Sequence, residues 1–113
     1  MKDSLALLRL MLDSFAKIRD FTAGMSYEDF LTDKKTQSAV IMQLEVVGEL
    51  AKRVSEEIRS DIDVPWKQMA GLRNLVAHNY FGLDLKIVWR TVSESAPEVE
   101  SKVRVYVSSR DAT

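Results

Sequence analysis

The residues best suited to chemistry lie close together between positions 71 and 81. His78 is the only histidine of the chain, and Arg73 precedes it by five residues. A neutral histidine can deprotonate the 2′-hydroxyl of RNA, and an arginine can hold the phosphate in bidentate fashion while charge develops on its oxygens. An acid must then protonate the departing 5′-oxygen. This residue pair could cleave RNA without a metal ion, and DNA, which lacks the 2′-hydroxyl, would be spared.

These residues fall at the end of a predicted helix, so their spacing determines which of their side chains lie on the same face. Tyr80 follows Arg73 by seven residues, nearly two turns, so the two share a helix face. His78 lies about 140° around an ideal helix from Arg73. The two converge if the helix unwinds near His78, which the nearby Gly82 would favour, or if a second subunit contributes. A lone helical histidine or arginine is more often structural or solvent-exposed than catalytic, and Tyr80 and Phe81 suit a core or an interface.

Composition limits the classes of protein to consider. The chain has 113 residues, which predicts one domain over 1–113, and it carries 16 basic and 17 acidic residues for a net charge of -1. A dedicated duplex-DNA binder is usually more basic. A site for one or two phosphates, or a site assembled between subunits, is still compatible with this charge.

The sequence predicts a cytoplasmic protein without a cofactor or metal ion. It contains no cysteine and one histidine, and no carboxylates cluster at ligand spacing. No apolar run approaches the ~20 residues that span a bilayer. Arg9 and Asp13 interrupt the apolar residues near the N-terminus, so we expect no targeting segment.

Helical periodicity dominates the chain, and strand alternation is nearly absent. A first helix is predicted from Asp3 or Ser4 to Thr22, ended by Gly24 and followed by a short turn after Ser26. A second long helix is predicted from Thr32 or Asp33 to about Ile58. Its apolar stripe comprises Val40, Leu44, Val47, Ala51, Val54 and Ile58.

Glycine and proline mark the remaining elements. A third helix begins at Pro65 and ends between His78 and Phe81, where Gly82 suits a C-terminal cap. A last helix follows Asp84, with a kink or brief break at residues 95–97 and a frayed tail from about residue 108. Close helix packing would explain Gly48 and Gly71. The sum is an all-α, antiparallel four-helix bundle with a short extra helical turn.

A wider pattern resembles the HepT-like branch of the HEPN superfamily. The defining motif of that branch is Arg, a polar residue, three further residues, His, any residue and Tyr. Arg73, Asn74, His78 and Tyr80 match it in full. The resemblance is strongest from about residue 40 to residue 92. Further matching segments are residues 47–49, 51–53, 64–66, 71–74, 78–84 and 87–89.

The resemblance implies a homodimeric endoribonuclease toxin. Arg73 and His78 of both subunits would form one metal-independent site, with Asn74 orienting the pair or contacting phosphate. Family members commonly act beside an antitoxin, a minimal nucleotidyltransferase of the MntA type. That partner is thought to transfer AMP to the motif tyrosine, here Tyr80, and the added phosphate would pair with Arg73 and repel RNA.

Two other interpretations stay open. The first is a non-catalytic helical partner that holds a nucleotidyltransferase or presents substrate to it, which the mild acidity favours. The second is a structural bundle whose Arg73 and Tyr80 pack at a dimer interface. Glu45 and Glu49 could support Arg73 or His78, although a solvated helix face is the simpler interpretation. The basic pairs at residues 34–35 and 52–53 could contact RNA, although ordinary surface charge is again the simpler interpretation.

Overall fold

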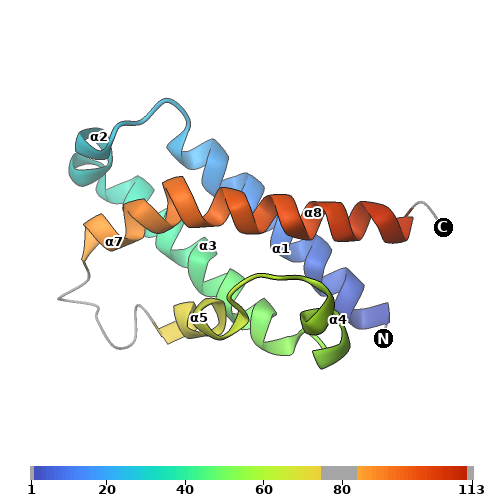
Figure 1. Ribbon diagram of the computed structural model, residues 1–113. Helices are drawn as coiled ribbons and strands as arrows, with labels where there is room; N and C mark the ends of the chain where they lie inside the picture. The colour runs from blue at the N-terminus through green and yellow to red at the C-terminus, as the bar shows by residue number, and fades with distance from the viewer. Residues whose placement is uncertain (1, 75–83, 112–113) are drawn as a thin grey trace.

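The computed structural model describes residues 2–74 and 84–111 (Figure 1). Every regular element within these ranges is helical, which confirms the all-α prediction. None of the helices in these ranges combines the length and the apolarity needed to cross a membrane. The elements in chain order are α1 (Lys2–Thr22), α2 (Tyr27–Thr32), α3 (Lys34–Arg53), α4 (Glu56–Asp61), α5 (Trp66–Gly71), the 3₁₀ turn η1 (Leu72–Asn74), α7 (Leu85–Arg90), the π turn η2 (Thr91–Ser95) and α8 (Ala96–Asp111).

The long helix α1 packs antiparallel to both α3 and α8 (Figure 1). The backbone N–H of Ser55, just after α3, donates to the buried hydroxyl of Ser4 at the start of α1. Arg9 of α1 pairs with Asp111 at the end of α8. These contacts join opposite ends of the paired helices, so the predicted antiparallel bundle is confirmed.

Most of the core comes from the apolar stripes of the three long helices, and the shorter elements add further buried residues such as Phe30, Met69 and Val88. The stripe predicted on the second helix is buried along its whole length. Each buried aliphatic side chain contributes roughly 1.5–3 kcal/mol through removal from water. The core residues contributed by α1 and α8 are Leu8, Met11, Phe15, Ile18, Ala96, Val99, Val103 and Val107.

The second predicted helix is in fact two helices. It ends at Arg53, Val54 is extended (φ -66, ψ 138), and Ser55 begins α4 by accepting a hydrogen bond from the N–H of Ile58. Val54 and Ile58 nevertheless stay buried on the same side. The apolar period therefore continues across a break that periodicity alone does not reveal.

The helix does not break at Pro97, and its backbone hydrogen-bonding pattern changes there instead. Pro97 has no N–H to donate to the carbonyl four residues earlier. The preceding turn is a π turn, in which the N–H of Ala96 donates to the carbonyl of Thr91. The predicted break is thus replaced by a wider turn inside one continuous helical run. That run extends to Asp111, three residues past the start of the predicted frayed tail.

Local caps end and begin the helices near α2. Gly24 adopts a positive φ of 75° after α1, as expected for a residue that stops a helix. Ser26 and Asp29 form a reciprocal capping box at the start of α2. Asp33 caps α3, and hydrogen bonds from the backbone N–H and the hydroxyl of Thr36 hold the pKa of Asp33 below its ordinary value.

Candidate functional site

The backbone of Arg73 lies directly on α3 because α3 carries a glycine at this point. A Cβ atom at Gly48 would lie 2.5 Å from the backbone nitrogen of Arg73 and 2.9 Å from the carbonyl oxygen of Met69. The close approach predicted for Gly48 is therefore confirmed. For Gly71, no described residue comes within 4 Å of such a Cβ, so the same prediction finds no support in the described part of the chain.

The segment that carries Arg73 is anchored at its other end by Trp66. The indole N–H of Trp66 donates to the carbonyl oxygens of Arg59 and Ile62, at 3.1 and 3.0 Å. Met69, one turn further along α5, is buried in the core. An indole anchor, a buried methionine and the contact at Gly48 together fix the path of residues 66–73 across α3.

The side chain of Arg73 is paired with a glutamate of α3. Its Nη1 atom lies 3.5 Å from Oε1 of Glu49, and Oε2 of Glu49 accepts a hydrogen bond from Nε of Arg53 at 3.0 Å. The side chains of Arg73 and Glu49 are 38% and 43% exposed. Glu49 therefore stays partly solvated, as the sequence favoured, and also takes part in this ion-pair network.

These side chains border an open hollow on the surface of α3. Asn74, which follows Arg73, is exposed at the same hollow, and its amide can both donate and accept hydrogen bonds. A cationic fork beside an amide can bind a phosphate oxygen pair. The described residues that line the hollow are Glu45, Val46, Glu49, Arg73 and Asn74.

The structure therefore brings together two of the four predicted site residues. His78 and Tyr80 lie outside the described residues, as does Gly82. Their approach to Arg73 stays a prediction. Within the described ranges, no three histidine, cysteine or carboxylate side chains are grouped closely enough to hold a metal ion.

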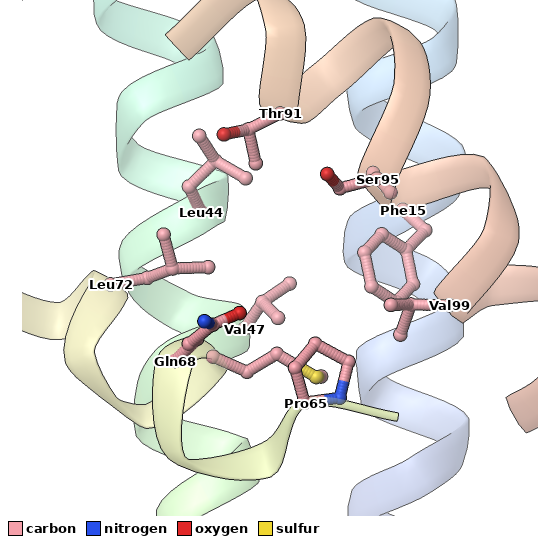
Figure 2. Close-up of a pocket in the computed structure, with 11 residues that line it drawn as sticks. Phe15, Leu44, Val47, Pro65, Gln68, Leu72, Thr91, Ser95 and Val99 are labelled. Carbon is pink, nitrogen blue, oxygen red and sulfur yellow. The ribbon is translucent and has the colours of Figure 1, made fainter. Parts of the chain in front are cut away.

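A second cavity, of about 140 Å³, is lined by residues of α1, α3, α5, η2 and α8 (Figure 2). Leu44 and Val47 of α3 face Ser95 of the π turn and Val99 of α8 across it. Among the described residues, its lining contains no ionisable side chain. Phosphate chemistry requires a cation, so we take the hollow beside Arg73 as the candidate site. The remaining lining residues are Phe15, Pro65, Gln68, Met69, Leu72, Thr91 and Ala96.

Comparison with known proteins places the chain in a ribonuclease family. A sequence family described as "Ribonuclease HepT-like" matches residues 11–106. "Probable ribonuclease HepT" of Thermococcus cleftensis is 43% identical over 86 residues, which cover 75% of this chain and 78% of that protein. "Putative RNase MJ0127" of Methanocaldococcus jannaschii is 45% identical over 97 residues, covering 85% and 80%. "Putative RNase MJ1380" of the same organism is 35% identical over 105 residues, covering 92% and 96%. No solved structure gives a significant match.

Proposed function

Because the chain belongs to the HepT-like ribonuclease family, we propose that it is a metal-independent endoribonuclease with Arg73 and His78 as its catalytic pair. The observation that carries this proposal is the placement of Arg73. Its backbone is fixed on α3 at Gly48, and its guanidinium borders an open hollow beside Asn74. A cation held in this way at the surface can meet a phosphate of a long, flexible substrate.

The reaction follows from the chemistry of the two side chains. His78 takes the proton of the 2′-hydroxyl, and the 2′-oxygen attacks the adjacent phosphorus. Arg73 stabilises the negative charge that develops on the phosphate oxygens. The bond from phosphorus to the 5′-oxygen breaks, and that oxygen takes a proton. The products are a 2′,3′-cyclic phosphate and a 5′-hydroxyl end, with no water or metal ion consumed in this step.

The active form proposed here is a homodimer with the site across its interface. The described residues of one copy border its hollow with one arginine and two carboxylates, which together attract RNA only weakly. A second copy across a two-fold axis adds its own Arg73 and His78 to the same cleft. His78 of the partner subunit can then supply the acid that the leaving 5′-oxygen requires.

The biological role proposed is that of a toxin controlled by a nucleotidyltransferase antitoxin of the MntA type. AMP transfer to Tyr80 would add phosphate charge next to Arg73, which would pair with the guanidinium and repel the RNA backbone. Mass spectrometry after co-expression with the cognate transferase should show AMP on Tyr80. An unmodified Tyr80 would leave occlusion as the remaining means of control.

The activity is tested on the purified, unmodified protein in EDTA with a mixed RNA pool. We expect cleavage to fall by about 10²–10³-fold in Arg73→Ala and in His78→Ala, as when one transition-state donor is removed. Mixed dimers of the two variants should recover part of the activity, because they contain one complete pair across the interface. No cleavage by a folded dimer with unmodified Tyr80 would favour a non-catalytic partner, or substrate-presenting subunit, of a nucleotidyltransferase.

A further inference from the structure

The carboxylate of Glu49 is divided between two arginines. Its Oε2 atom accepts from Nε of Arg53 at 3.0 Å, and its Oε1 atom lies 3.5 Å from Nη1 of Arg73. Arg53 is one helical turn further along α3, so it holds the carboxylate from within the same helix. The second oxygen is thereby directed toward the candidate hollow.

The Arg73 backbone is fixed by packing, but its side chain needs a separate restraint. A free arginine side chain populates many rotamers, and ordering it costs conformational entropy. Among the described residues, the contact that restrains the guanidinium uses Nη1. The guanidinium presents five N–H donors in a rigid fork, so its other edge can still bind a phosphate through two hydrogen bonds.

We propose that Glu49 is the positioning residue for Arg73, a role that rests on the function proposed above. Glu49 turns one edge of the guanidinium toward itself and so presents the other edge to the scissile phosphate. As a carboxylate beside the same hollow, it also repels the RNA backbone. Glu49 therefore acts in two opposite directions, because it favours the productive geometry and weakens ground-state binding.

These opposite effects on cleavage rate and on RNA affinity distinguish a residue that positions Arg73 from one that only stabilises the fold. The pair between Glu49 and Arg73 is more than one-third exposed on both sides, so its contribution to folding is small. We expect Glu49→Gln to slow cleavage about 10-fold through loss of orientation. The same variant should bind RNA as tightly as the native protein, or up to about 5-fold more tightly, because a repulsive charge has been removed. A folding defect would weaken both properties.

The experiment uses the full chain and five variants. Single-turnover cleavage in EDTA is measured for the native protein, Glu49→Gln, Glu49→Asp and Glu98→Gln, and melting temperatures are recorded for each. Glu98 is the matched control, because it forms an i,i+4 pair with Lys102 on α8. Binding is measured by fluorescence anisotropy with a mixed-sequence 2′-O-methyl oligoribonucleotide, which cannot be cleaved. The binding series also includes Arg73→Ala and the double variant with Glu49→Gln.

Slow cleavage by Glu49→Gln, partial recovery in Glu49→Asp and unchanged behaviour of Glu98→Gln would support the inference. Native cleavage rates in Glu49→Gln would overturn it and leave the ribonuclease proposal intact. Parallel losses of cleavage, binding and melting temperature would also overturn it. If the native protein is inactive, the ribonuclease proposal fails. The RNA-binding measurements then test whether Glu49 positions Arg73. An effect of Glu49→Gln on RNA affinity that disappears when Arg73 is also replaced would support the pairing of Glu49 with Arg73. An effect on affinity that is independent of Arg73, or the absence of RNA binding, would overturn it.

Discussion

Two networks of the same composition occupy different parts of the bundle. Each consists of a glutamate between an arginine on its own helix and an arginine distant in sequence. Glu100 of α8 pairs with Arg104 at 2.7 Å and with Arg19 of α1 at 2.8 Å. Glu49 of α3 pairs with Arg53 at 3.0 Å and with Arg73 at 3.5 Å. Both therefore link a long helix to a second element of the fold.

Burial of the central carboxylate separates the two networks. The side chain of Glu100 is 9% exposed, whereas that of Glu49 is 43% exposed. A buried carboxylate without its partners is costly, so Glu100 requires both arginines and joins α1 to α8. Glu49 remains solvated and tolerates the loss of a partner. The same three residue types thus form a structural tie in one place and an adjustable pair beside the candidate site in the other.

The comparison is tested most strongly by replacing the distant arginine of each network with lysine. Arg73→Lys keeps the charge but loses the planar fork that binds phosphate bidentately. We expect cleavage of RNA to fall by about 10–100-fold, the equivalent of ~1–3 kcal/mol. Arg19→Lys should leave the cleavage rate at the native value. Equal rates in the two variants would remove the functional distinction between the networks.

A second test exchanges the central glutamate for glutamine in each network. Glu100→Gln leaves two arginines around a buried, uncharged amide, and we expect it to lower the free energy of unfolding by about 2 kcal/mol. Glu49→Gln should change the same quantity by no more than about 0.5 kcal/mol. Urea denaturation followed by circular dichroism measures both values. A larger loss in Glu49→Gln than in Glu100→Gln would contradict the assignment of structural and functional roles.

The sequence predicted the parts of this picture that depend on local pattern. The apolar stripe of α3 and the packing at Gly48 could be identified from residue type and spacing, and both are confirmed. Arg73 and Asn74 were selected through the family resemblance, and their role stays a prediction. The break after Arg53 could not, because the apolar period continues across it. Nor could the π turn, because the sequence shows the missing donor of Pro97 but not how the helix accommodates it.

The pairing of Glu49 with Arg73 could be identified only from the three-dimensional structure. The two residues are 24 positions apart, and nothing in the spacing of charges along α3 selects Glu49 over Glu45 as the partner. The selection comes from the path of the α5–η1 segment across Gly48. Gly71 shows the limit of the same reasoning, since this helical glycine was predicted to mark close packing and yet no described residue packs against it.

The smallest of the expected effects compares those two glycines. Alanine at position 48 gains helix propensity, but its methyl group meets backbone atoms of Arg73 and Met69 that cannot rotate away. The α5–η1 segment must shift, and we expect Gly48→Ala to lower the free energy of unfolding by about 1–2 kcal/mol. Cleavage should also slow, because the backbone of Arg73 moves with the segment. Denaturation and single-turnover cleavage measure the two effects.

Gly71→Ala is the matched control, because it adds the same methyl group five residues after Trp66, where none of residues 2–74 and 84–111 packs within 4 Å of the new carbon. It should stabilise the protein by up to about 1 kcal/mol through helix propensity alone and leave cleavage unchanged. If Gly48→Ala behaved like Gly71→Ala in both assays, the backbone of Arg73 would not depend on Gly48. The ion pair with Glu49 would then be the main restraint on Arg73. The network around Glu49 would in that case contribute more to the stability of the fold than is expected for an ion pair exposed to solvent.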